Sequence, residues 1–388
     1  MNFRIISYII GWVCNFQAVF MLLPCVTAMV YMENDFFAFL LSMGICLTIG
    51  LPLTVKKPRN KVFYIKDGCV AVALSWIAMC VTGSLPFLFT NSIAHPIDAL
   101  FETVSGFTTT GSSILTDVEV LPHCILIWRS FTHWIGGMGV LVFLLSLLPL
   151  AGGYHMNLMK AESPGPSVSK LVPKVQSTAK ILYTIYIAMT VIQMIFLLIG
   201  NVPLFDTLCI TFGTAGTGGF GIKNDSMGSY SSYCQIVTTV FMILFGVNFS
   251  VYYLVITKNI KQALKFEEIR YYFGIIAAAI ILITINTTHL FANVGEAIRQ
   301  SAFQVGSIIT TTGFSSTDFN QWPALSKTIL VLLMFVGACA GSTGGGIKVS
   351  RFLILCKAAK KELQLYLHPN AVKKIKMDDK TITHDVLR

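Results

Sequence analysis

A motif of threonine and glycine that could coordinate a cation occurs three times in this chain of 388 residues. Thr-Thr-Thr-Gly stands at 108–111 and again at 310–313, and a related Gly-Thr-Gly-Gly stands at 216–219. Each copy follows a helix-length apolar segment and a short polar stretch, and each precedes another apolar segment. This arrangement is typical of a pore loop, in which backbone carbonyl oxygens replace the hydration shell of an ion. The sequence therefore predicts an ion channel or a channel-like transporter.

The residue types in these loops suit the coordination of a dehydrated cation. Glycine permits the backbone angles that aim successive carbonyls at one axis, and threonine adds a hydroxyl oxygen. A short helix that enters the membrane and ends at the loop presents its carbonyl end, which favours a cation. Small residues also allow close helix packing in membranes, but three loops at a regular spacing favour a filter. The predicted filter and potassium-binding residues are Thr109, Thr110, Gly111, Thr217, Gly218, Gly219, Thr311, Thr312 and Gly313.

A further glycine-rich stretch interrupts the last apolar segment at 341–346. Each glycine disfavours a helix by ~1 kcal/mol relative to alanine, so we expect the chain to unwind there. Our hypothesis is a loop just beneath the filter that moves as a gate; a static kink is the alternative. A phosphate loop is not expected, because Ile347 separates the last glycine from the lysine and no strand precedes it. The predicted gating-loop residues are Gly341, Ser342, Thr343, Gly344, Gly345, Gly346 and Lys348.

The composition indicates that these loops are positioned by membrane helices. Hydrophobic residues make up 54% of the chain and charged residues only 12%, against about 25% charged in soluble domains. The mean hydropathy is +0.71. The first apolar run lacks a clear cleavage site, so no signal peptide is expected. Apolar segments near the ~20 residues of a spanning helix occur at 5–31, 36–55, 68–91, 125–150, 180–200, 233–257, 271–291 and 326–358.

The placement of the basic residues predicts the orientation of these helices. The net charge is +10, but the basic residues gather in alternate links between apolar segments and in the tail, which argues against a nucleic-acid partner. The intervening links are acidic or nearly free of lysine and arginine. The positive-inside rule then places the N-terminus and the tail in the cytoplasm. All three threonine–glycine loops fall on the outer side.

The loops recur with a period of about a hundred residues, which predicts repeated helix–pore loop–helix units. The fold class expected is an all-α polytopic membrane protein of the potassium-channel kind, with two peripheral N-terminal helices. The predicted divisions are two helices at 1–60, pore units at 61–155, 156–262 and 263–362, and a basic cytoplasmic tail at 363–388.

The remaining chemistry-bearing residues suggest no catalytic site. The ten cysteines lie mostly inside apolar runs without paired spacing, as packing residues do. No histidine pair has the spacing of a metal site, so potassium at the filter is the only metal expected, and no cofactor is predicted. Arg129 could pair with Glu102 or Asp117, or extend toward the membrane interface. Without a nucleophile–base pair, the chain is not expected to be an enzyme.

Six segments together resemble the TrkH/KtrB family of potassium uptake proteins over essentially the whole chain; they are 105–111, 134–139, 161–166, 217–220, 310–314 and 339–348. The resemblance implies a homodimeric subunit of the inner membrane that moves potassium inward, and with it rubidium. It also implies a TrkA-like cytoplasmic nucleotide-binding partner that regulates opening, and a gating role for 341–346. The family has four pore units, whereas three are found here, so the sequence is expected to be truncated before the fourth.

The leading prediction is therefore the pore-forming subunit of a Trk-type potassium uptake system. Glycine in all three filters favours potassium over sodium. An ion-coupled secondary transporter with discontinuous helices is an alternative, although it would predict an inverted repeat. A non-conducting fragment is the other alternative, because one pore unit is missing.

Overall fold

The computed structural model describes residues 1–55, 57–58, 64–137, 139, 175–368, 375–378 and 380–382. The regular structure of these residues is helical, apart from a short antiparallel pair of strands, β1 (Lys376–Met377) and β2 (Lys380–Thr381). Within the described ranges, five helical segments are long and apolar enough to cross a membrane, or six if one bent pair counts as a single span. The prediction of an all-α polytopic membrane protein is confirmed.

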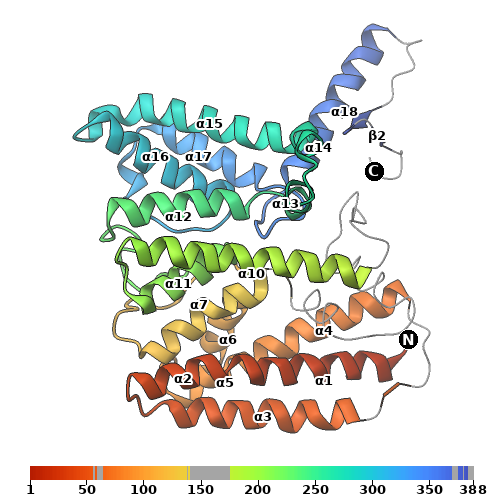
Figure 1. Ribbon diagram of the computed structural model, residues 1–388, viewed down its shortest axis with the longest axis vertical. Helices are drawn as coiled ribbons and strands as arrows, with labels where there is room; N and C mark the ends of the chain where they lie inside the picture. Colours follow the sequence, from red (N-terminus) through yellow and green to blue (C-terminus); the bar gives the residue numbers. More distant parts are fainter. Residues whose placement is uncertain are drawn as a thin grey trace.

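Three N-terminal helices, α1 (Phe3–Phe20), α2 (Leu22–Val30) and α3 (Phe36–Val55), form one end of the molecule (Figure 1). The helices α1 and α3 approach closely through glycines. A Cβ atom added at Gly50 would lie 2.2 Å from Asn15 Oδ1, and one at Gly11 would lie 2.7 Å from Leu53 Cβ. Small residues allow this contact in a membrane, where dispersion forces between helices must replace the hydrophobic effect.

Three units follow these helices, each with a long helix, a short helix, a threonine–glycine loop and a further helix, and Figure 1 shows them stacked along the long axis of the molecule. The first contains α4 (Ile65–Gly83), α5 (Leu85–Phe89), α6 (Pro96–Phe107) and α7 (His123–Gly137). The second contains α10 (Val175–Ile199), α11 (Leu204–Ala215), α12 (Ser232–Phe245), α13 (Phe249–Ile256) and α14 (Ile260–Lys265). The third contains α15 (Glu267–Thr287), η1 (Thr288–Leu290), α16 (Val294–Ile309), η2 (Phe319–Gln321), α17 (Ala324–Val336) and α18 (Val349–Leu367).

The short helices α6, α11 and α16, which we call pore helices after the predicted pore loops, each end directly at a threonine–glycine loop. Each begins with an acid in its first turn, namely Asp98, Asp206 and Glu296, which suits the positive end of a helix. The N-terminus and β2 lie on the same side of Figure 1 as α14. The pore helices α11 and α16 lie toward the opposite side.

One predicted span differs from the structure, and another is divided where the sequence analysis expects the chain to unwind. The segment 233–257 is not continuous, because α12 and α13 meet at a bend of 93°. The Asn248 side chain accepts a hydrogen bond from Ser250 N, which caps the second helix and ends the first. The segment 326–358 is divided by the glycine-rich stretch between α17 and α18. The last part of the predicted span 125–150 lies outside the described residues.

Candidate functional site

The three threonine–glycine loops share one backbone conformation. In each loop the first filter residue is a threonine with positive φ and the third is a glycine with positive φ. The φ values are +55°, +54° and +58° at Thr109, Thr217 and Thr311, and +75°, +78° and +86° at Gly111, Gly219 and Gly313. A positive φ is unfavourable for a β-branched residue such as threonine. Its recurrence at three equivalent positions shows that the surrounding structure imposes it, as it does at functional sites.

The amide groups of the loops point back to the pore helices. The middle residue of each loop donates its N–H to a carbonyl five positions earlier, at 2.8–3.0 Å: Thr110 to Ser105, Gly218 to Gly213, and Thr312 to Ser307. None of the carbonyls of the nine filter residues accepts a hydrogen bond from another described residue. Buried carbonyls are nearly always paired. A row of unpaired ones is what a dehydrated cation requires.

The loops lie side by side in chain order, and glycine is required where they touch. A Cβ atom at Gly111 would lie 2.0 Å from Gly218 O, and one at Gly219 would lie 2.0 Å from Thr312 O. At Gly313, the equivalent atom would meet nothing within 4 Å among the described residues. The first and second loops therefore each contact the next loop, whereas no described residue lies against the third loop at Gly313.

His133 explains why the second loop has glycine where the other two have threonine. A Cβ atom at Gly218 would lie 2.1 Å from His133 Nδ1. Phe220 N donates to His133 Nε2 at 3.2 Å, so this nitrogen carries no proton. The protonated Nδ1 must then donate to Gly106 O, 2.9 Å away. The neutral imidazole thus joins the end of the first pore helix to the second filter.

A buried ion pair braces the first filter from behind. Arg129 Nη2 and Glu102 Oε1 lie 2.7 Å apart, and the two side chains are 2% and 0% exposed. Glu102 also accepts hydrogen bonds from the Ser113 hydroxyl and from Ile114 N, just after the first filter. Arg129 donates to Gly221 O and stacks on Phe220, just after the second. Of the partners suggested for Arg129, the structure selects Glu102.

The glycine-rich stretch lies directly against two of the filters. Gly345 N donates to Thr311 Oγ1 at 2.7 Å, and Thr217 Oγ1 donates to Thr343 O at 3.0 Å. A Cβ atom at Gly344 would lie 3.0 Å from Thr310 O. The backbone has positive φ at Gly341 and Gly346 within the stretch, and at Gly337 and Lys348 on either side of it. The Lys348 ammonium donates a hydrogen bond to Gly344 O. The described structure thus brings the residues predicted as a gate together with the second and third filters. Thr109 of the first filter makes no such bond to the stretch.

The sequence analysis missed one part of this site, the break between α12 and α13. Gly246 O accepts from Cys339 N at 3.0 Å, and Phe249 N donates to Gly341 O at 3.0 Å. The Thr343 hydroxyl donates to Phe245 O at 3.2 Å. The carbonyls of Phe245 and Gly246 at the end of α12 are therefore satisfied by Thr343 of the glycine stretch and by Cys339 just before it. The signal was Asn248 inside an apolar run, since asparagine is a strong helix-capping residue.

Glu33, Asp35 and Cys124 lie close enough together to hold a metal ion. Glu33 already has other partners, because its two oxygens accept from His123 N and Cys124 N, at 2.6 and 3.0 Å. This carboxylate caps the N-terminus of α7, where the first amides have no partner within the helix. Within the described residues, the arrangement is explained by helix capping.

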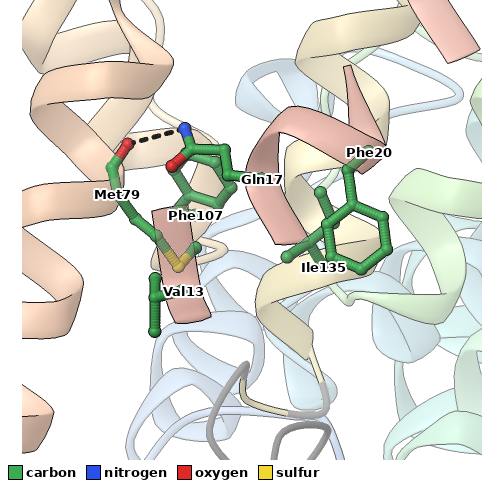
Figure 2. Close-up of a pocket in the computed structure, with 6 residues that line it drawn as sticks. All are labelled: Val13, Gln17, Phe20, Met79, Phe107 and Ile135. Carbon is green, nitrogen blue, oxygen red and sulfur yellow. Dashed lines mark hydrogen bonds between the residues drawn. The ribbon is translucent and has the colours of Figure 1, made fainter. Parts of the chain in front are cut away.

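The back of the first filter is closed by apolar packing. Figure 2 shows a narrow space lined by Val13, Gln17, Phe20, Met79, Phe107 and Ile135. The Gln17 amide donates to Met79 O at 3.0 Å, and the space admits no water molecule. Phe107, the last residue of α6, therefore rests on a dry junction with the N-terminal helices. This junction supports the filter rather than binding a ligand.

Comparison with known proteins agrees with this architecture. The family model described as "TrkH: Cation transport protein" matches residues 35–388. The Trk system potassium uptake protein TrkH of Salmonella typhimurium is 33% identical over 394 residues, covering 100% of this chain and 82% of that protein. The TrkG protein of Escherichia coli K12 is 33% identical over 99% of this chain and 81% of that protein. The crystal structure of the potassium transporter TrkH from Vibrio parahaemolyticus is similar with a TM-score of 0.89 and 30% identity, covering 100% of this chain and 81% of that one.

Proposed function

Because this chain belongs to the TrkH family of cation transport proteins, we propose that it takes up potassium across a cell membrane as the pore-forming subunit of a Trk-type system. Its similar relatives are named as potassium uptake proteins, and the matching crystal structure is of a potassium transporter. Potassium is then the transported ion, and transport rather than an enzymatic reaction is its activity.

One observation carries the proposal, namely the shared backbone of the three filter loops. Alternating positive φ values and amides bound to the pore helices leave nine carbonyls without a partner among the described residues. We assign ion coordination to these residues, at 109–111, 217–219 and 311–313. The pore helices end at this point with their carbonyl ends, which adds a field that favours a cation.

We assign gating to the stretch 341–346 together with Lys348. It contacts the filter through Thr217 and Thr311, so ions leaving the filter on that side would meet it first. Removing residues 341–346 should therefore increase ion flux. Reduced or unchanged flux in a folded protein would argue for a static kink.

The remaining parts of the proposal follow from the family and from the charge pattern. We propose a homodimer in the inner membrane, with the N-terminus and the tail in the cytoplasm and a TrkA-like nucleotide-binding subunit bound there. The proposed pore units are 61–155, 156–262 and 263–362, with peripheral helices at 1–60. The N-terminus and the last described residues lie at one edge of the molecule, which is compatible with this orientation (Figure 1).

The test is rubidium uptake in a bacterium that lacks its own potassium uptake systems. The wild-type chain should take up rubidium, and Gly313→Asp should abolish uptake by placing a carboxylate at the filter. A matched control is Gly274→Ala, since this helical glycine also has nothing within 4 Å of an added Cβ. Uptake that survives Gly313→Asp would refute the filter assignment. Uptake that requires a sodium or proton gradient would favour a coupled transporter.

A second candidate function is a subunit that conducts only when another polypeptide segment completes the pore. Two observations favour it. No described residue lies within 4 Å of a Cβ atom added at Gly313, and the Thr108 and Thr110 side chains of the first filter loop are exposed. A well-expressed chain without rubidium uptake, restored by a co-expressed pore segment, would support this candidate.

A further inference from the structure

Glu268 is a buried acid that touches both ends of the glycine stretch. It is the second residue of α15 and is 3% exposed. Its Oε1 atom accepts hydrogen bonds from Ala340 N at 2.6 Å and from Ser350 N at 3.1 Å. Ala340 immediately precedes the stretch 341–346, and Ser350 lies in the first turn of α18, just after it. One carboxylate oxygen therefore binds the main-chain amides of Ala340 and Ser350, on either side of the stretch.

The groups around Glu268 offer its carboxylate hydrogen-bond donors and a nearby positive charge. The first amides of α18 have no partner within the helix and lie at its positive end. Lys348 interacts with Glu268 electrostatically, and the Asn248 side chain interacts with its carboxylate. Asn248 lies in the break between α12 and α13, so the acid also interacts with the segment that packs against the start of the stretch.

If the stretch moved away from the filter, the amide of Ala340 or of Ser350 would separate from Glu268. A main-chain amide and a buried carboxylate oxygen would then lose their partner, which is costly. Hydrogen bonds to an ionised group are stronger than those between neutral groups. The contact of Glu268 therefore favours the position in which Gly345 and Thr343 lie against the filter threonines.

We propose that Glu268 is a positioning residue that holds the stretch 341–346 in its closed place under the filter. The inference rests on the proposed function of this stretch as a gate. It adds a residue outside the stretch, 72 positions away from Ala340 in the sequence, as the group that sets how readily the loop leaves the filter.

The test is Glu268→Gln, which keeps the shape of the side chain and removes its charge. The matched control is Glu267→Gln, because this neighbouring acid binds the Lys357 ammonium instead of the loop. Amide hydrogen exchange of a peptide covering 337–350 is measured on the purified full chain in detergent. Glu268→Gln should raise this exchange by about fivefold or more, as a typical coupling energy between sites does. Glu267→Gln should leave it within about twofold of wild type, and Glu268→Asp should restore part of the protection.

Rubidium uptake is the second readout. Glu268→Gln should increase uptake in the full chain but add nothing when residues 341–346 are deleted. Unchanged exchange in Glu268→Gln would overturn the role of Glu268, whether or not the chain conducts. An increase in uptake that persists without the stretch would overturn it as well, because the acid would then act elsewhere. Failure of the proposed function is recognised separately, by uptake that survives Gly313→Asp.

Discussion

The first and third filter loops have the same sequence and the same internal bonds but different surroundings. In the first loop the Thr108 and Thr110 hydroxyls lie 2.8 Å apart, and in the third those of Thr310 and Thr312 lie 2.7 Å apart. Yet Thr310 and Thr312 are fully buried, whereas Thr108 and Thr110 are exposed. The Thr-Thr-Thr-Gly motif therefore sets the shape of a loop, and the segments packed around it, such as Gly246 and Gly344 at Thr310, decide whether its threonines are buried.

The two loops are also held from behind by different chemistry. Glu102 lies nine residues before Gly111, and Gln304 lies nine residues before Gly313. Glu102 binds Arg129 and the segment after the first filter, whereas the Gln304 amide donates to Thr317 O at 3.2 Å. A charged brace thus supports the loop in which Thr108 and Thr110 are exposed, and a neutral one supports the loop in which Thr310 and Thr312 are buried.

The largest expected effect comes from breaking the charged brace. Glu102→Ala leaves Arg129 buried without its counter-ion, which should destabilise the protein by about 3–5 kcal/mol. Gln304→Ala removes neutral hydrogen bonds and should cost about 1–3 kcal/mol. Thermal unfolding of the purified chain in detergent would measure both. Equal losses would show that the two braces do not differ in kind.

Alanine substitutions at the filter glycines would distinguish the effect of steric overlap with a neighbouring loop from the effect of backbone strain at positive φ. Gly111→Ala places a Cβ atom 2.0 Å from Gly218 O at a φ of +75°, so rubidium uptake should fall by more than about tenfold. Gly313→Ala meets no described atom within 4 Å and keeps only the strain of its φ of +86°, so the loss should be smaller. Equal losses would indicate that Gly313 has a close neighbour in the conducting protein.

Removing a hydroxyl from each loop should give a smaller difference. Thr312→Val deletes a buried hydrogen bond to Thr310 and should cost about 1 kcal/mol of folding free energy. Thr110→Val deletes the equivalent bond at an exposed position, where water can replace it, and should change stability by less than about 0.5 kcal/mol. Denaturant or thermal unfolding of both variants would test this. A larger loss in Thr110→Val would mean that this face is covered in solution.

The smallest expected effect is a dependence of stability on pH at the first unit. Burial raises the pKa of Glu33, but hydrogen bonds from Cys124 and His123 outweigh burial and leave this pKa below its usual value. The contribution of Glu33 is therefore present above the pKa of the unfolded chain and is lost as pH falls through the folded pKa. The helix α17 of the third unit begins at Pro323 without a side-chain cap. Glu33→Gln should weaken the acid-induced loss in melting temperature, and an unchanged pH profile would contradict this assignment.

The local features of the molecule could be predicted from the sequence. The lengths of the apolar segments, the order of helix, pore helix and loop, and the interruption at 341–346 depend on residues close in the chain. The bend at Gly246–Asn248 was missed, because the apolar run around it satisfies the length of a spanning helix and Asn248 was the only warning.

The contacts that give the site its form could not be predicted in the same way. His133 could not be linked to Gly218, nor Glu268 to Ala340 and Ser350, because each pair joins elements of different helices. For Arg129 the sequence left three possibilities, and only packing against Phe220 and Glu102 selects one.

The sequence by itself determined the family, the membrane class and the three loop motifs, because hydrophobic length and glycine or threonine content act locally. Only the tertiary structure decided which loops touch, which threonines are buried and which acid holds the glycine stretch. The physical reason is that burial and hydrogen-bond partners depend on distances between segments far apart in the chain. Identical motifs at 108–111 and 310–313 therefore have the same backbone and different environments.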